Sequence, residues 1–575
     1  MKTITHILIV TFLIVTTNLV RAQEYFGTTS IGDTSIDINY RSAVNSQGEI
    51  FTLGLYSGTL TLGDATITWE GGNADGFLTR HDSNGTPLDI KGFGGFMDDV
   101  ALDVAIDIND NIYITGYFTG AGPDSFDADP GPEEFLLMQP SPFASRDCFI
   151  IKLDPNGDFI WAKQVSNPAA VANEDSYSIE VDTDGNVYVG GRFAYADFDP
   201  STDGEEIIIS TGGGSSLDGF LLKLDTDGNY VWVKTFTSEG LVQINDMEFD
   251  ANGDLLMIGD FEETVDLNPS ETEDAEFTSN GARDTFMAKF TSDGEYLWAQ
   301  TFGGAASEIS KVIKSIDEDI YIGGMYTETT DLNPTDGVNE FTALGGYDGY
   351  LSKFNSNGDY QFSYTIGGDD TTNLEDVYSL RKNEATGNLF VTGTFLVTTD
   401  FDNSDNTAES TSNGNTDSYL LEIDTDGNYV NHWTIGGPLA EVNPQLEINE
   451  NNEIITFGAF QGTDVDFNPF DEEDLISSIG SYDVYFSRFN TEPIAGIEES
   501  QLTNVVIYPN PTTGIIYIID KNNIADSYEI YNVLGTKIAT GTIQSQIDMS
   551  AFATGIYVLK VNSNTSSITR KIIKN

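Results

Sequence analysis

The chain repeats one pattern of hydrophobic and polar positions seven times. One phrase begins with aspartate and continues as an apolar run, at Asp75–Asp82, Asp147–Asp154, Asp218–Asp225, Asp284–Thr291, Asp348–Asn355, Asp417–Asp424 and Asp483–Asn490. A second phrase ends in Gly-x-Phe or Gly-x-Tyr, at Ile50–Tyr56, Ile112–Phe118, Val187–Phe193, Leu255–Phe261, Ile320–Tyr326, Leu389–Phe395 and Ile454–Phe460. Their β-branched and aromatic residues predict strands. Tandem repetition of such units predicts a ring or solenoid.

Two further strand-like runs complete each repeat. One run precedes the second phrase, as at Ala101–Ile108, and another follows the first phrase, as at Phe159–Val165. We therefore expect four antiparallel strands, A to D, in which B and C are the two phrases. Turns such as Asp182–Asn186 contain Asn and Gly, which adopt the positive φ that tight hairpins need. The sequence predicts an all-β, seven-bladed propeller over residues 23–490.

The amino terminus is expected to close this ring. No strand D follows the seventh repeat, whereas Tyr25-Phe26-Gly27 resembles the strand D ending Thr301–Gly304. A borrowed outer strand would remove an exposed sheet edge. The pattern resembles the seven-bladed β-propeller repeat family of secreted bacterial proteins. That resemblance covers about residues 24–490 and implies a fold without a single activity.

The two ends of the chain predict export. Residues 1–22 combine Lys2, an apolar run from Ile7 to Val20 and a small-residue cleavage site, which is typical of a signal peptide. The run is short for a membrane anchor, and no long apolar segment follows it. The single cysteine, Cys148, excludes an internal disulfide, and we expect it to be a small buried residue of its repeat.

Charge divides the chain into two domains. Residues 23–503 contain 88 acidic and 17 basic residues, a net charge of −71, whereas residues 504–575 have a net charge of +2. The change indicates a linker at 491–503. A field this negative argues against nucleic acid or an anionic membrane as a partner, and it favours cations. We expect a monomer.

The long connections between strands B and C, here called the arms, contain the candidate chemistry. Six arms carry Asp-x-Asp or Asp-x-Asn, at Asp127/Asp129, Asp197/Asp199, Asp266/Asn268, Asp331/Asn333, Asp400/Asp402 and Asp466/Asn468. These oxygens, with later carboxylates, could bind Ca²⁺. Alternatively, each Asp or Asn caps a turn that proline fixes. Recurrence does not separate the two hypotheses. A four-stranded meander places all arms on one face, which should be strongly negative.

Other notable residues are interpreted as repeat positions. Strand C has a base in six repeats, for which we expect a ring of ion pairs between blades, to the leading aspartate of strand C. A ring of bases that binds a ligand is the alternative. Trp161, Trp232 and Trp298 share one position and predict core packing. The two histidines of the exported chain, His81 and His432, stand at ordinary strand positions and do not indicate a triad.

Residues 504–575 predict a small β-sandwich of the immunoglobulin type. Its phrases include Tyr508–Gly514, Ile530–Gly535, Ala553–Lys560 and a basic end, Arg570–Asn575. They are similar to the C-terminal sorting domain of the type IX secretion system of Bacteroidetes. The motif positions are Pro509, Asn510, Pro511, Gly514, Gly535, Gly555, Tyr557, Lys560, Lys571 and Lys574. The resemblance implies handling by that machinery, removal of the module, and attachment to the cell surface or release. An ordinary adhesive sandwich is the alternative.

These observations favour an exported, non-enzymatic protein that binds or adheres to an extracellular protein or glycan. No catalytic residue and no cofactor other than Ca²⁺ is predicted. One alternative is a carbohydrate-active hydrolase or lyase that uses two carboxylates of the arms. Another is a structural component of the cell surface.

Overall fold

The computed structural model describes residues 23–491 and 505–575 except for short stretches. The stretches are 121–124, 140–144, 168–172, 202–203, 212–215, 271–272, 336, 369–373, 405, 471–472, 521–525, 533–536, 544–545 and 563–566. The predicted signal peptide and nearly all of the predicted linker therefore lie outside the described residues. The described strands form two compact units, Tyr25–Asn490 and the part that follows Thr491. No described helix is long and apolar enough to cross a membrane.

Six sheets of the first unit are four-stranded antiparallel meanders in chain order. They are β2 (Asp37–Val44), β3 (Ile50–Tyr56), β6 (Asp75–His81), β7 (Pro87–Gly95); β8 (Asp99–Ile106), β9 (Ile112–Gly120), β12 (Ser145–Leu153), β13 (Phe159–Val165); β14 (Asp175–Val181), β15 (Val187–Phe193), β18 (Asp218–Leu224), β19 (Tyr230–Phe236); β20 (Val242–Phe249), β21 (Leu255–Phe261), β24 (Asp284–Phe290), β25 (Tyr296–Gly304); β26 (Glu308–Ile316), β27 (Asp319–Tyr326), β30 (Asp348–Phe354), β31 (Tyr360–Gly368); and β32 (Ser379–Lys382), β33 (Leu389–Phe395), β36 (Asp417–Ile423), β37 (Tyr429–Ile435).

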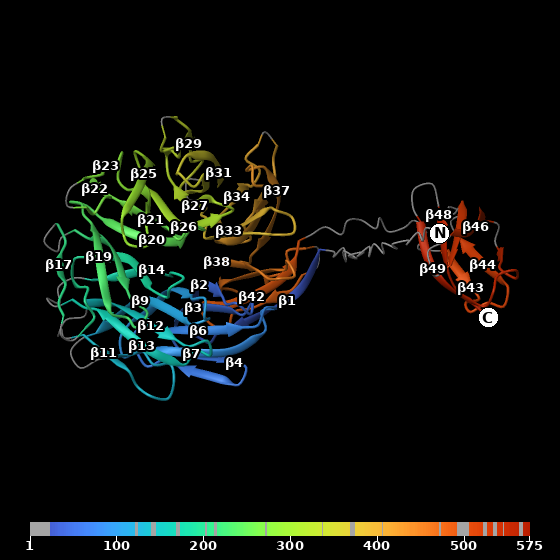
Figure 1. Ribbon diagram of the computed structural model, residues 1–575, viewed down its shortest axis with the longest axis horizontal. Helices are drawn as coiled ribbons and strands as arrows, with labels where there is room; N and C mark the ends of the chain where they lie inside the picture. The colour runs from blue at the N-terminus through green and yellow to red at the C-terminus, as the bar shows by residue number, and fades with distance from the viewer. Residues whose placement is uncertain are drawn as a thin grey trace, which may run out of the picture. The chain divides into compact units, whose positions relative to one another are not determined.

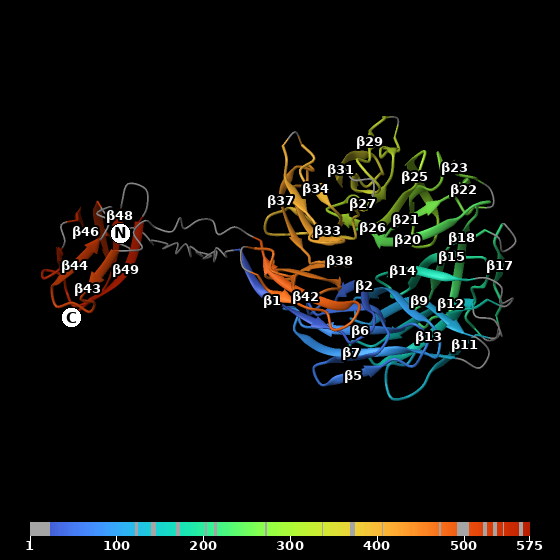
Figure 2. The ribbon, with the colours of Figure 1, turned by 180° about the vertical axis from the view of Figure 1, so that it is seen from behind.

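The seventh sheet joins both ends of the repeat region. Its order is β1 (Glu24–Ile31), β42 (Asp483–Asn490), β39 (Ile454–Phe460) and β38 (Glu441–Ile448). The first strands β2, β8, β14, β20, β26, β32 and β38 contact one another in a closed ring. Figures 1 and 2 show such first strands near the middle and strands such as β19 and β37 at the rim. The prediction of an all-β propeller closed by the amino terminus is confirmed.

The register of the closing strand differs from the prediction. Gly32 packs against Asp483, since a Cβ on Gly32 would lie 2.1 Å from the Cγ of Asp483. Gly303 packs in the same way against Asp284, at 2.4 Å. Gly32 is therefore the equivalent of Gly303, and the proposed match of Phe26-Gly27 to Phe302-Gly303 was wrong by five residues. The short phrase Phe-Gly misled because β1 has Gly27 at the position where β13, β19 and β25 have tryptophan.

Cores lie between neighbouring sheets. Tyr113 and Ile150 of the second sheet, for example, pack against Val189 and Phe220 of the third, and all four are fully buried. Burial of a large apolar side chain contributes about 1.5–3 kcal/mol. Successive sheets therefore stabilise one another without a disulfide, and Cys148 is a buried member of the same core.

Each arm folds as a small hairpin at the start of its connection. The hairpins are β4 (Thr59–Leu62) with β5 (Ala65–Thr68) in the first repeat, then β10 (Ser125–Asp127) with β11 (Leu136–Met138), β16 (Tyr195–Asp197) with β17 (Ile207–Ile209), β22 (Thr264–Asp266) with β23 (Glu276–Thr278), β28 (Thr329–Asp331) with β29 (Glu340–Thr342), β34 (Thr398–Asp400) with β35 (Glu409–Thr411), and β40 (Val465–Asp466) with β41 (Leu475–Ile476).

The second unit is a two-sheet sandwich. One sheet contains β43 (Val505–Tyr508), β44 (Ile515–Asp520) and β47 (Gln546–Asp548), and the other contains β46 (Lys537–Thr542), β45 (Ser527–Asn532), β48 (Gly555–Asn562) and β49 (Ser567–Lys574). Ile516, Ile530, Leu559 and Ile572 fill the space between them. This confirms the predicted small β-sandwich.

Candidate functional site: the arms and the axial funnel

The Asp-x-Asx residues of the arms form turns. The Oδ1 atom of Asp400 accepts the backbone N–H of Asp402 at 3.1 Å and that of Ala408 at 2.8 Å. The Oδ1 atom of Asp402 accepts the N–H of Ser404 at 3.0 Å. The same bonds, to residues two positions later and eight or nine positions later, occur at Asp127, Asp197, Asp266, Asp331 and Asp466. Asp129, Asp199, Asn268, Asn333 and Asn468 cap the following turn.

The middle residue of the motif explains why the turn recurs. It is apolar in all six arms and fully buried, at Ala128, Phe198, Leu267, Leu332, Phe401 and Phe467. The ring of Phe401 lies 5.4 Å from that of Phe395, the aromatic residue that ends strand β33. The two polar residues thus bend the chain so that the residue between them enters the core.

The arms also tie each sheet to the preceding one. The first strand of the hairpin pairs with strand D of the preceding sheet in β10 with β7, β28 with β25, and β34 with β31. Isolated bridges Ser166–Asp197 and Gly436–Asp466 make the same connection in two further arms. The arms are therefore part of the scaffold.

Calcium binding by these residues stays a prediction. Within the described residues, no group of three or more His, Cys, Asp or Glu side chains is placed to hold a metal ion. One oxygen of each leading aspartate is already occupied by two amides. The geometry favours the turn hypothesis of the two that the sequence left open.

The strand C bases pair with acids, but the predicted partner was wrong. Lys289 Nζ lies 2.7 Å from Asp250, and Lys353 Nζ lies 2.8 Å from Asp319. Both acids belong to the A–B turn of the same sheet, because adjacent strands bring that turn beside the end of strand C. The connection between sheets is made to carbonyl oxygens instead, as in Lys353 Nζ to Thr425 O at 3.1 Å.

The leading aspartate of strand C instead meets a second buried acid at the start of the next strand A. Asp417 and Glu441, which are 1% and 0% exposed, hydrogen-bond to each other. Burial first, and Asp417 second, raise the pKa of Glu441 far above its usual range. Burial, and then Asp147, raise the pKa of Glu174 to about 9. Burial, and then Asp75, raise the pKa of Asp99 in the same way. Burial and the nearby like charge disfavour the ionised form in each pair, so protonation of one carboxyl group is favoured.

A cavity of about 300 Å³ lies on the propeller axis, and we call it the axial funnel. Six of the first strands each contribute a lining residue, β2 adds Arg41, and Tyr378 comes from the segment that directly precedes β32. The lining is Tyr40, Arg41, Leu102, Tyr177, Asn245, Lys311, Tyr378 and Asn443. In β2, β8, β14, β20, β26 and β38 the lining residue lies where the pairing with the second strand shifts by one residue or more. A β-bulge of this kind redirects a side chain. The bulges therefore turn six sequence-distant positions toward one axis, and Tyr378 joins them from the segment that precedes β32.

Two of the funnel tyrosines each face a cation. Lys311 Nζ lies 2.7 Å from Asp376 and 3.8 Å from the centre of the Tyr378 ring. Asp376 keeps the pKa of Lys311 above its usual value, against the effect of burial. On the other side, Arg192 lies 2.8 Å from Asp175 and its guanidinium faces the Tyr177 ring at 5.4 Å. Burial raises the pKa of Tyr40 to about 12, with Tyr117 and Tyr378 as smaller causes.

Ion pairs lie beside the funnel. Arg41 Nη2 reaches across from the first sheet to the fifth and donates to Lys311 O at 2.9 Å, and it lies 3.7 Å from Asp246. Arg381 pairs with Glu447 at 2.7 Å, and Lys314 pairs with Glu248. Lys314 and Arg381 line a further space of about 50 Å³, which shares Arg41 and Tyr378 with the funnel.

Sequence reasoning missed the funnel and placed the candidates in the arms. The missed signal was disagreement between repeats: Tyr40, Leu102, Tyr177, Asn245, Lys311, Tyr378 and Asn443 stand at corresponding places of otherwise similar strands. His81 and His432 are not brought together; His81 stacks on Phe486 and His432 on Phe401. Trp161, Trp232 and Trp298 lie in strand D opposite the strand C lysines, as core packing predicts.

The motif residues of the second unit meet at its last strand. Asn510 donates to Lys571 O at 2.6 Å and accepts the N–H of Ile573 at 2.8 Å. Pro509 and Pro511 flank it and follow cis peptide bonds, and Gly514 donates to Thr512 Oγ1. Tyr557, Lys560 and Lys574 lie on β48 and β49, Gly555 begins β48, and Gly535 lies outside the described residues.

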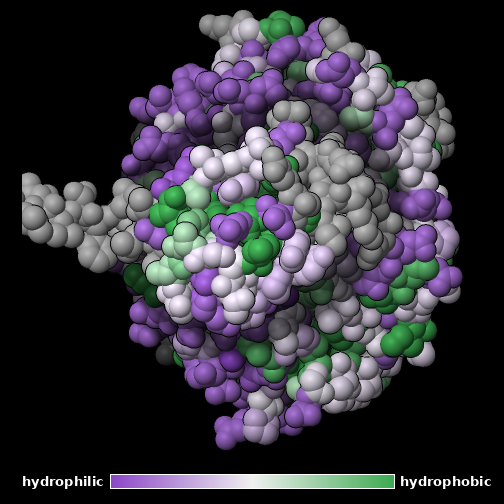
Figure 3. All heavy atoms as spheres, turned by 90° about the vertical axis from the view of Figure 1, so that its right-hand side faces the viewer, coloured by the Kyte–Doolittle hydropathy of each residue, from purple (hydrophilic) through white to green (hydrophobic). Residues whose placement is uncertain are grey.

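The outer surface agrees with an exported, highly charged protein. Figure 3 shows a face on which hydrophilic residues predominate and hydrophobic residues form separate patches. Residues 506–575 match the family model of the secretion system C-terminal sorting domain. The carboxy-terminal unit is thus a type IX sorting domain, and the chain is exported to the cell surface or the extracellular space by that machinery.

The comparisons for the rest of the chain are distant. A WD repeat-containing protein of Acanthamoeba polyphaga mimivirus is 22% identical over 492 residues, which are 72% of this chain and 35% of that relative. This chain therefore spans about a third of that protein. The periplasmic gluconolactonase PpgL of Pseudomonas aeruginosa is 10% identical, with 77% of this chain and 99% of that chain covered and a TM-score of 0.36. The dihydro-heme d1 dehydrogenase NirN is 8% identical, with 91% and 80% covered and a TM-score of 0.32.

Proposed function

We propose that the exported propeller is a non-enzymatic binding protein that holds a saccharide in the axial funnel. The observation that carries the proposal is the convergence of residues from seven repeats on one cavity. Tyrosine rings offer apolar faces with a polar edge, and the side-chain oxygens of Asn245 and Asn443 offer acceptors. Pockets that combine aromatic walls with a few placed polar groups are typical of small-ligand sites.

The charges of the funnel support binding rather than catalysis. Asp175 and Asp376, which contact cations beside the funnel tyrosines, are 1% exposed and both form ion pairs, with Arg192 and with Lys311. A general acid or base must exchange a proton with the substrate, and acids held in this way by cations are poorly placed to do so. The paired cations leave donor atoms that can still bind sugar hydroxyls or a sugar carboxylate.

The test uses the exported chain and a panel of neutral and uronic-acid-containing oligosaccharides. Tyr177→Ala and Tyr378→Ala are expected to weaken binding at least about tenfold each, a loss of about 1.4 kcal/mol. Tyr230→Ala is the matched control, because Tyr230 is a half-exposed tyrosine of the rim strand β19. Equal affinity in all three variants, or no binding by any member of the panel, would overturn the proposal.

The same assay addresses the alternative of a carbohydrate-active enzyme. The bound oligosaccharides are recovered and analysed for shortened or unsaturated products. Products whose formation is lost in one Asp or Glu variant of an arm would replace the binding role with hydrolase or lyase activity. Unchanged oligosaccharides, bound through the funnel tyrosines, support the proposal.

A further inference from the structure

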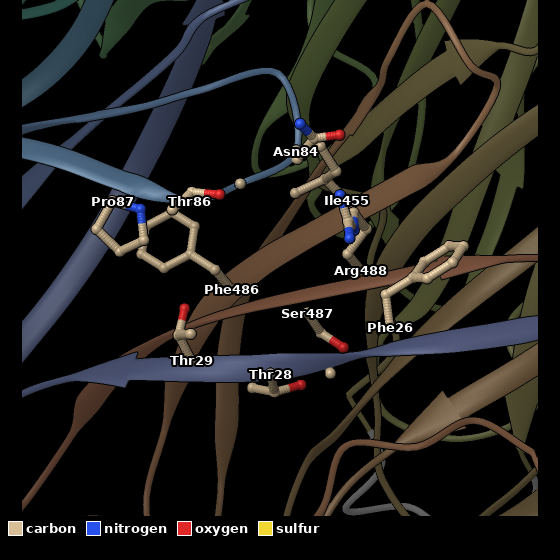
Figure 4. Close-up of a pocket in the computed structure, with 12 residues that line it drawn as sticks. Phe26, Thr28, Thr29, Asn84, Thr86, Pro87, Ile455, Phe486, Ser487 and Arg488 are labelled. Carbon is tan, nitrogen blue, oxygen red and sulfur yellow. The ribbon is translucent and has the colours of Figure 1, made fainter.

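A second cavity lies at the seam where the amino-terminal strand closes the ring. Its volume is about 260 Å³, and its lining comes from β1, β39, β42 and the β6–β7 turn. Figure 4 shows Phe26, Ile455, Phe486 and Arg488 around this space, with Pro87 beside the turn. It is separate from the axial funnel, because the two cavities share no lining residue.

The other seams of the propeller show what normally fills this position. Trp161, Trp232 and Trp298 stand opposite Lys152, Lys223 and Lys289. The C–D turn of the following sheet packs on the indole: a Cβ on Gly294 would lie 2.9 Å from Trp232, and one on Gly358 would lie 3.2 Å from Trp298. Trp161 Nε1 also donates to Thr226 O of that turn at 3.3 Å. An indole ring therefore fits between strand D and the next turn.

The closing strand has glycine at this position. Gly32 corresponds to Gly303, so five residues earlier Gly27 corresponds to Trp298. A Cβ on Gly27 would meet no atom within 4 Å. At the turn of the first sheet, a Cβ on Gly85 would meet only Ile455, at 3.8 Å. The cavity is thus the space of an indole that the chain itself does not supply.

The lack of tryptophan does not by itself open such a cavity. Asp89 takes the same position in the first sheet, opposite Arg80. There the stem of Lys91 covers the slot, since a Cβ on Gly157 would lie 2.8 Å from Lys91 Cε. The space that remains is about 10 Å³. The seam cavity is open because Gly27 is followed by the short side chains of Thr28 and Thr29.

The lining offers the contacts that an aromatic ring needs. Phe486, which is 4% exposed, and Ile455 provide an apolar floor. The guanidinium of Arg488 lines the cavity and lies 4.7 Å from the Phe26 ring. In the second and third sheets, the strand D lysines Lys163 and Lys234 lie over Trp161 and Trp232 at 5.8 and 5.7 Å, so a cation accompanies the indole at those seams as well. A cation over an aromatic face is attracted to the ring. We propose that the seam cavity binds a small planar aromatic molecule of the indole class.

The experiment titrates the exported chain with 5-fluoroindole and follows the ligand by fluorine NMR. Saturable binding of one equivalent is expected. Phe26→Ala and Arg488→Gln are expected to weaken it about fivefold each. Phe135→Ala, which removes an exposed ring of an arm, is the matched control and should bind as the unaltered chain does. Non-saturable binding would overturn the proposal. So would Phe26 and Arg488 variants that bind 5-fluoroindole as tightly as the unaltered chain does.

A gain-of-site variant tests the shape argument. Trp161→Gly combined with Lys163→Thr should open the same slot in the second sheet and take up a second equivalent of 5-fluoroindole. The second substitution is needed because Lys163 Cε lies 2.4 Å from a Cβ on Gly228 and would otherwise cover the slot, as Lys91 does in the first sheet. If the variant still binds one equivalent of 5-fluoroindole per chain, the claim that the shape of the slot determines indole binding is contradicted. Tyr378→Ala should leave indole binding unchanged, so a failure of the seam proposal is distinguishable from a failure of the funnel proposal.

Discussion

The arms and the axial funnel differ in how they use the repeat. Every Asp-x-Asx arm places the same three side chains in the same turn, and the middle one enters the core. The funnel places a different residue from each repeat around one cavity. Repetition here reports a structural requirement that each sheet must meet, whereas variation at an equivalent position marks a surface free to be selected for a ligand. The arms therefore belong to the scaffold, and the funnel is the proposed binding site.

The largest effect is expected from Phe401→Ala in an arm. Removal of this fully buried ring leaves a cavity between two sheets and should lower the free energy of unfolding by about 3–5 kcal/mol. Tyr378→Ala in the funnel should change it by less than about 1 kcal/mol. Denaturant unfolding measures the free energy of unfolding of both variants. Equal losses of this free energy would contradict the assignment of the arm to the scaffold and of the funnel to a binding surface.

A smaller effect separates the turn hypothesis from the calcium hypothesis. Asp400→Ala removes the acceptor of two backbone amides and should cost about 1–3 kcal/mol. Asp400→Asn keeps the Oδ1 acceptor and should be nearly neutral. If the asparagine variant is as unstable as the alanine variant in calcium-containing buffer, the charge of Asp400 matters and a bound cation becomes the better explanation.

The third prediction concerns pH. The pKa of Glu174 is raised to about 9 and that of Asp75 to about 7 in the folded chain. Such groups stabilise the fold fully below their unfolded pKa values near 4, and the contribution is lost as pH rises through the folded values. Melting temperature should therefore be higher at pH 5 than at pH 8.

Glu441→Gln isolates one carboxyl pair. An amide can donate to Asp417 without a proton from solvent, so the variant should melt about 2 °C or more above the unaltered chain at pH 8 and close to it at pH 5. A variant that shows the unaltered pH dependence and no gain at pH 8 would contradict proton sharing at this interface. Glu409→Gln, on an exposed arm strand, is the control.

The smallest effect is expected from removing calcium. Because backbone amides already satisfy Oδ1 of the leading aspartates, excess EDTA should leave the melting temperature of the exported chain unchanged. A clear fall, restored by CaCl₂ and absent in Asp400→Asn, would establish the calcium role that the sequence leaves open.

The sequence was a good guide wherever a property repeats. Seven copies of the strand phrases predicted the sheets, and the position of Asn490 without a following strand predicted that β1 closes the ring. The predicted register of β1 was wrong, because Phe26-Gly27 has the residue types of Phe302-Gly303 but does not make the same contacts. The predicted ion-pair partner of the strand C bases was wrong for a related reason. Lys289 pairs with Asp250, which is near only because strands A, B and C lie side by side.

By itself, the sequence determined the architecture and the export route, since both depend on local patterns: strand periodicity, turn residues and the motif around Asn510. Only the tertiary structure decided which residues meet. Tyr40, Tyr177, Lys311 and Tyr378 are separated by tens to hundreds of positions, and bulges in three strands turn the first three toward the axis that Tyr378 also lines. A one-residue shift in strand pairing leaves almost no mark on hydrophobic alternation, and closure of the ring sets the distances across the funnel.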